Sequence, residues 1–143
     1  ASARAVGIET ERDINEAWNV TMAEWASDER IADILGRGFA NYSALPQPEK
    51  AVFHTRVGRV LNHHYTQHRM SEQGMGDPAF LKAMDQVALS ILHSPGGRQW
   101  WDDIGPFYAH YEAVQRMIKD QPNVRPFSDV AIWKRDDLGG LSA

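Results

Sequence analysis

Apolar residues recur at intervals of three and four along almost the whole chain, and this period constrains the fold more than any other feature of the sequence. Such spacing gathers apolar side chains on one face of a helix, whereas a half-buried strand needs strict alternation. The clearest stripes are Ile14, Ala17, Trp18, Thr21 and Trp25; Ile31, Ile34, Leu35, Gly38 and Tyr42; Phe53, Val57, Val60, Leu61, His64 and His68; Phe80, Leu81, Met84, Val87, Ala88 and Ile91; and Phe107, Tyr111, Val114 and Ile118. The sequence therefore predicts an all-α fold.

Prolines and glycines separate these stripes and set the expected helix ends. Proline lacks an amide donor and restrains the residue before it, so it ends one helix or opens the next. We expect a long helix over about residues 48–73, another over 78–93, a short one from Ser94-Pro95 through Trp101, and a last one from Phe107 that ends at Gln121-Pro122. Thr10 is the expected N-cap of the first helix, and Ser27 or Asp28 that of the second.

The domain organisation follows from the same punctuation. Residues 1–122 are expected to form one domain, a compact bundle of five or six amphipathic helices whose short connections make most neighbours antiparallel. Residues 123–143 directly follow Pro122 and contain one further proline and two glycines, which indicates an extended C-terminal tail. Within that tail, residues 130–133 (Val-Ala-Ile-Trp) are apolar enough to dock on another surface.

Charge and composition narrow the classes of function. The net charge is −4, and the 15 basic residues are spread along the chain without a basic run, so nucleic acid is not an expected partner. There is no cysteine, which excludes thiol catalysis and thiolate metal sites. No stretch approaches the roughly 20 apolar residues of a membrane span, so contact with a membrane would need a segment outside this sequence. No motif indicates a cofactor.

The octapeptide LNHHYTQH, residues 61–68, places three of the six histidines together. On a helical wheel His64 and His68 share the arc of Val57 and Leu61 and should face the core, whereas His63 should project the opposite way. Two histidines at i and i+4 are spaced like metal ligands, but the glutamate that follows the first histidine in zinc metalloproteases is replaced by Tyr65. The alternatives are an inward metal-binding pair and a pair of hydrogen-bonded structural histidines.

Trp100 and Trp101 are adjacent on the short helix. Neighbouring helical positions point about 100° apart, so we expect one indole to lie at a boundary or an interface. Tryptophan is common among interface anchors, and Ile132 and Trp133 in the tail are further candidates. The chain has no Gly-x-Ser-x-Gly nucleophile elbow and no recognisable catalytic arrangement.

Several short strings, in order along about residues 10–118, resemble a group of uncharacterised bacterial proteins. They are Asp33-Ile-Leu-Gly-Arg-Gly38-Phe, Ser43-Ala-Leu-Pro-Gln-Pro-Glu49, Tyr65-Thr-Gln-His-Arg69 and, most specific, Ser94-Pro-Gly-Gly-Arg-Gln-Trp-Trp101. The resemblance implies an α-helical domain that often follows an N-terminal membrane-spanning helix, with no assigned activity. The group is expected to have an acidic residue where this chain has His64, so the resemblance does not imply a metal site.

These observations favour a non-enzymatic helical interaction module that binds a protein partner or a second copy of itself. Its candidate interface residues are Trp100, Trp101, Ile132 and Trp133. The alternative is a metal-binding helical-bundle protein or enzyme that uses His64 and His68. A third hypothesis is a sensor that holds a small ligand between its helices.

Overall fold

The computed structural model describes residues 12, 16, 18–25 and 28–134. The predicted all-α fold is confirmed, and the described residues contain no strand. The principal helices are α2 (Glu29–Asn41), α3 (Gln47–Glu72), α4 (Pro78–Leu92), α5 (Pro95–Ile104) and α6 (Tyr111–Asp120). Three short 3₁₀ helices, η1 (Tyr42–Ala44), η2 (Gly105–Phe107) and η3 (Phe127–Asp129), lie between or after them.

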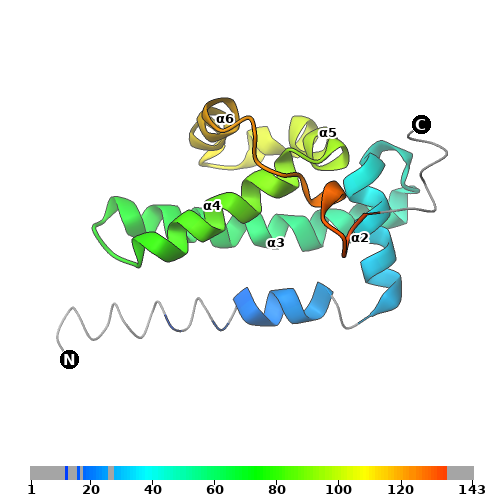
Figure 1. Ribbon diagram of the computed structural model, residues 1–143, viewed down its shortest axis with the longest axis horizontal. Helices are drawn as coiled ribbons and strands as arrows, with labels where there is room; N and C mark the ends of the chain where they lie inside the picture. Colours follow the sequence, from blue (N-terminus) through cyan, green and yellow to red (C-terminus); the bar gives the residue numbers. More distant parts are fainter. Residues whose placement is uncertain (1–11, 13–15, 17, 26–27, 135–143) are drawn as a thin grey trace.

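The long helices α3 and α4 form an antiparallel hairpin on which the other helices lie (Figure 1). The turn between them contains Gly74 and Gly76, both at positive φ, which glycine adopts without strain. Residues 18–25 are helical and run antiparallel to α3, because Trp18 contacts His63 while Glu24 pairs with Arg59. In Figure 1, α2 crosses one end of α3, and α5 and α6 lie above the α3–α4 hairpin.

The expected helix starts are confirmed where a cap residue precedes a helix. Asp28 accepts a hydrogen bond from the Arg30 amide at the start of α2, and Asp77 accepts one from the Ala79 amide at the start of α4. The stripe that begins the first helix, Ile14 and Ala17, and its expected cap Thr10 lie outside the described residues.

The last helix begins later than its apolar spacing predicts. Phe107 belongs to η2 and is 85% exposed, and Tyr108 is extended before α6 starts at Tyr111. The expectation that Phe107 opens the final stripe is therefore wrong. Gly105-Pro106 ends α5. Residues 108–110 then form a turn and do not belong to α6.

The helix α5 approaches its neighbours at backbone distance. A Cβ on Gly96 would collide with the carbonyl oxygen of Gly38 in α2, and one on Gly97 would collide with the carbonyl oxygen of Ile91 in α4. Trp100 and Trp101 follow one turn later and fill the core between these helices. The glycine pair thus determines how closely α5 can pack.

The described part of the tail returns to the core. Phe127 packs edge-on against Phe39, and the Ser128 amide donates to Ser94 Oγ at 3.2 Å. Trp133 lies edge-on to Phe39 and to Trp25, with ring centroids 5.4 and 5.9 Å away. Residues 130–133 therefore dock on the chain's own helices through Trp133. Residues 135–143 lie outside the described residues.

Substituting Gly96→Ala should destabilise the fold by about 3 kcal/mol or more, because the new methyl group meets a backbone carbonyl that cannot rotate away. Gly58→Ala in α3 is the matched control, since its Cβ would meet only the Tyr108 hydroxyl, at 3.0 Å. It should stay within about 1 kcal/mol of wild type. Urea unfolding followed by circular dichroism measures both, and equal losses would contradict the close-approach explanation.

Candidate functional site

Three histidines from two elements meet on the face of α3 that is turned toward α6. His64 and His68 stand one turn apart on α3, and His110 occupies the N-cap position of α6. The ring centroids of His64 and His110 are 5.3 Å apart, and those of His68 and His110 are 6.3 Å apart. We call these three residues the histidine cluster. The prediction that His64 faces inward is confirmed, since its side chain is 1% exposed.

A chain of hydrogen bonds runs from α4 through the cluster. His64 Nε2 lies 2.6 Å from Asp85 Oδ1, and His64 Nδ1 lies 3.1 Å from His110 Nε2. An ionised carboxylate can only accept, so His64 Nε2 carries a proton and donates to Asp85. When His64 is neutral its Nδ1 is an acceptor, and His110 must donate through Nε2.

This order of donors leaves one nitrogen without a partner. His110 is 5% exposed, and its Nδ1 is buried without a hydrogen bond. Burial, together with the neighbouring His64 and His68, lowers the pKa of His110 to about 4. His110 is therefore neutral at pH 7, and with Nε2 donating, its Nδ1 is an unpaired acceptor.

His68 lies at the edge of the cluster. Its side chain is 30% exposed, and its Nε2 lies 2.9 Å from Glu72 Oε1, one helical turn further along α3. The expectation that His68 points toward the core is therefore met only in part. It borders a cavity that the same face of α3 shares with α6.

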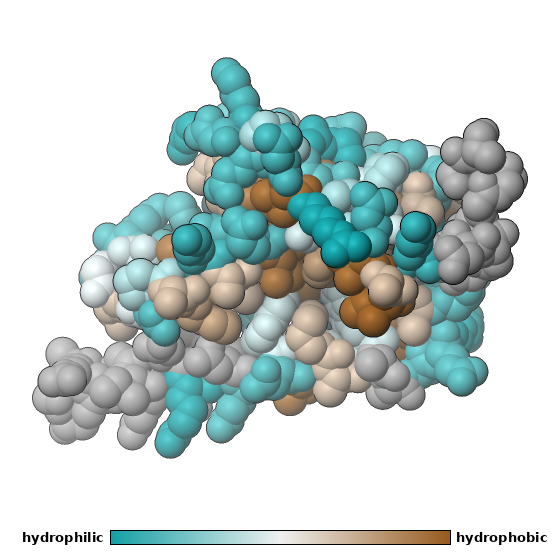
Figure 2. Space-filling model, in the orientation of Figure 1, coloured by the Kyte–Doolittle hydropathy of each residue, from teal (hydrophilic) through white to brown (hydrophobic). Residues whose placement is uncertain are grey.

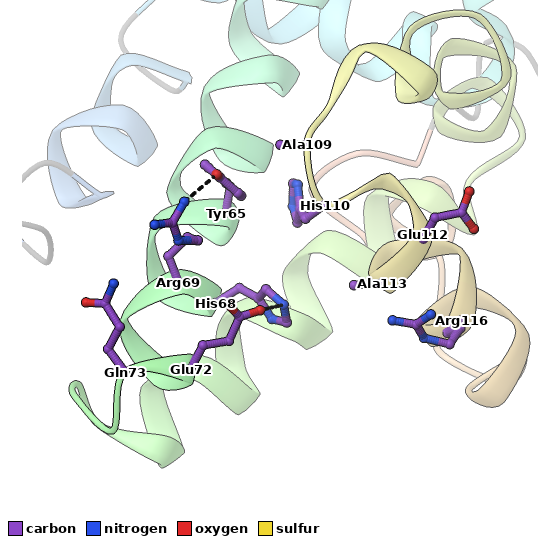
Figure 3. Close-up of a pocket in the computed structure, with 10 residues that line it drawn as sticks. All are labelled: Tyr65, His68, Arg69, Glu72, Gln73, Ala109, His110, Glu112, Ala113 and Arg116. Atoms are coloured by element: carbon purple, nitrogen blue, oxygen red, sulfur yellow. Dashed lines mark hydrogen bonds and ion pairs between the residues drawn. The ribbon is translucent and has the colours of Figure 1, made fainter.

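The cavity has a volume of about 530 Å³. It is lined by Tyr65, His68, Arg69, Glu72, Gln73, Ala109, His110, Glu112, Ala113 and Arg116 (Figure 3). Figure 3 shows α3 contributing one wall and the start of α6 the other, with His110 between them. The cavity is polar, and His110 is one of its lining residues.

The metal-ligand hypothesis for His64 and His68 finds no third ligand here. Within the described ranges, no group of three histidine, aspartate or glutamate side chains is arranged to hold a metal ion. Both nitrogens of His64 take part in hydrogen bonds, to Asp85 and to His110. The arrangement is that of a hydrogen-bonded cluster.

The expectation that Trp100 or Trp101 lies at an interface is wrong for the folded chain. Their side chains are 0% and 1% exposed. Helices α2 and α4 and the 3₁₀ helices η1 and η2 surround the short helix α5, so adjacent positions both reach apolar neighbours. Each indole N–H also has a partner, His54 Nδ1 for Trp100 at 3.2 Å and Gln115 Oε1 for Trp101 at 2.7 Å.

The tail candidates differ from each other. Trp133 is partly buried against Phe39 and Trp25, whereas Ile132 is 79% exposed. Apolar residues on the face drawn in Figure 2 form small separate patches between polar ones. An isolated exposed apolar side chain is ordinary for a soluble domain. Among the four residues proposed from sequence as interface anchors, Ile132 alone stays well exposed.

His63 faces away from the cluster, as predicted, but it is covered. Its Nε2 lies 3.2 Å from Thr21 Oγ1, and Trp18 packs edge-on against its ring. Burial, followed by the nearby Arg59 charge, lowers the pKa of His63. This histidine fixes residues 18–25 to α3 and takes no part in the cavity.

Comparison with known proteins adds no assignment. No family model, no curated protein and no solved structure matches the chain. No helix in the described part of the chain has both the length and the apolar character to cross a membrane.

Lowering the pH should destabilise the protein partly through His110. Unfolding returns the pKa of His110 from about 4 to 6.5. Between pH 4 and pH 6.5 the imidazole is therefore protonated in the unfolded chain and neutral in the folded chain. The free energy of unfolding that depends on His110 is fully present above pH 6.5 and is lost as the pH falls to about 4. The total loss is at most about 3 kcal/mol. In urea unfolding, His110→Gln should lose less stability than wild type between these limits. Equal losses would contradict the assignment.

Proposed function

We propose that this chain is a non-enzymatic helical binding module whose ligand occupies the cavity between α3 and α6. The cavity, of about 530 Å³, falls within the range of small-molecule sites. Its lining mixes cationic, anionic and neutral polar side chains, so it suits a small polar ligand better than an apolar one.

The buried Nδ1 of His110 is the observation that carries this proposal. Buried polar atoms nearly always have a hydrogen-bond partner, and an exception calls for an explanation. His110 lines the cavity, and its other nitrogen is committed to His64. A donor group brought by a ligand, directly or through a water molecule, would satisfy the remaining nitrogen.

Binding is favoured over catalysis by the composition of the cavity. The chain Asp85–His64–His110 has the donor order of a general base. However, the lining includes no serine, threonine, cysteine or lysine that such a base could activate as a nucleophile. The histidine cluster is therefore proposed to orient and hydrogen-bond a ligand.

A protein partner or a second copy of the chain stays a prediction from the sequence, as do a membrane tether and a bacterial source. Trp100 and Trp101 are buried, so two of the candidate residues for contact with a protein partner are removed. Ile132 is the candidate that remains well exposed. The cavity offers a more specific site than this single side chain.

A tryptophan at Ala113 should abolish ligand binding, because this residue lines the cavity and a large ring there would fill it. Ala83→Trp is the control, since Ala83 is exposed on α4 and does not line the cavity. Ligand-detected NMR with a library of small polar molecules should find binders of the wild type and of Ala83→Trp that fail to bind Ala113→Trp. The absence of any binder, or binding that survives in Ala113→Trp, would refute the proposal.

A further inference from the structure

Two arginines from different helices border the cavity, Arg69 on α3 and Arg116 on α6. Arg69 donates through Nη1 to the hydroxyl of Tyr65 at 3.0 Å, and its guanidinium lies 5.8 Å from the centre of that ring. This hydrogen bond raises the pKa of Arg69. Tyr65 accepts in the bond, so its own O–H proton is free to donate to a ligand.

In the part of the chain that the structure describes, the carboxylates of the lining form no ion pair with these arginines. Glu72 is engaged with His68 at 2.9 Å. Glu112 precedes Arg116 by four residues, the spacing at which an acid and a base on a helix normally pair. Among the described residues, however, no ion pair joins them. Figure 3 shows Arg116 directed toward the cavity and Glu112 directed away from it.

An unpaired guanidinium is well matched to a carboxylate. Its planar fork can donate two parallel hydrogen bonds to the two oxygens. With Arg69 and Tyr65 on the opposite wall, the cavity has hydrogen-bond donors on both of its walls. The lining charges of Arg69, Arg116, Glu72 and Glu112 sum to zero, so a single negative charge fits better than a dianion.

We propose that the cavity binds a small monocarboxylate that also carries a hydroxyl or amino group, with Arg69, Arg116 and Tyr65 holding the carboxylate. This inference rests on the proposed binding function. The second group of the ligand faces the acceptors of the site, Glu72 and the buried Nδ1 of His110. An α-hydroxy acid or an α-amino acid has this chemistry.

The test uses four probes, lactate, alanine, propionate and inorganic phosphate, titrated into the ¹⁵N-labelled protein and followed by amide chemical shifts. Lactate or alanine should bind at the cavity and bind more tightly than propionate, which lacks the second group. Phosphate should bind more weakly than both. Tightest binding by phosphate or propionate would overturn the ligand class.

Variants locate the carboxylate. Arg116→Gln and Arg69→Gln should each weaken binding of the preferred probe roughly tenfold to a hundredfold, because each removes a charge-assisted donor. Lys119→Gln is the matched control on α6, because Lys119 is exposed and does not line the cavity, and it should change affinity by no more than about twofold. Equal effects of Arg116→Gln and Lys119→Gln would overturn the assignment.

The ligand class and the binding function fail in different ways. If library compounds bind at the cavity but none of the carboxylates does, the ligand class is wrong and the binding module stands. If nothing binds at the cavity, both proposals are wrong. Circular dichroism of the arginine variants, whose side chains are solvent-exposed, should match wild type and so exclude unfolding as the cause.

Discussion

The close approach of α5 to α2 and α4 is the contact on which the rest of the structure depends. Gly96 and Gly97 bring the backbone of α5 against the carbonyl oxygens of Gly38 and Ile91. Only glycine allows this approach, because any Cβ would clash with those carbonyl oxygens. The approach in turn places Trp100 and Trp101 between the helices, where each indole N–H reaches a fixed acceptor.

Residues 33–39, 43–49 and 94–101 meet around this contact. Arg37 forms a bidentate pair with Glu49, at 2.7 and 3.0 Å, and bonds Asp33 at 2.9 Å, which joins α2 to the start of α3. The hydrogen bond from Arg37 lowers the pKa of the Glu49 carboxyl. The amide of Ser43 donates to Gln99 in α5 at 2.9 Å. These segments therefore have structural roles, because they join α2 to the start of α3 and to α5.

Helix type and most helix ends could be predicted from the sequence because local signals fix them. Asp28, Asp77 and the prolines act within one turn, so their effect does not depend on the rest of the fold. The tryptophan prediction was wrong because burial on two sides requires knowing that α5 is surrounded by other helices. Phe107 was misassigned because its spacing from Tyr111 matches the helical period, although the turn at residues 108–110 separates it from α6.

Only the α3 side of the candidate site could be predicted from the sequence, because local spacing places residues on one helix face. His64 and His68 share one helix face by spacing alone, and so do Tyr65, Arg69 and Glu72. Their partners on the other wall, His110 and Arg116, come from beyond the break at Gly105-Pro106, and no local signal predicts the path of that turn. The sequence did not predict that a third histidine, His110, lies against the His64 and His68 pair.

The two ends of α3 are thus used differently. Near its start, Glu49 and Phe53 belong to the contacts that hold α2 and α5 in place. About four turns later, roughly 20 Å along the helix, His64, His68 and Arg69 border the cavity. The glycine contact supplies rigidity at one end, so α6 can leave an open, polar space at the other. A site that leaves a buried nitrogen unsatisfied lowers stability, and a fold tolerates that cost only where other contacts already determine the structure.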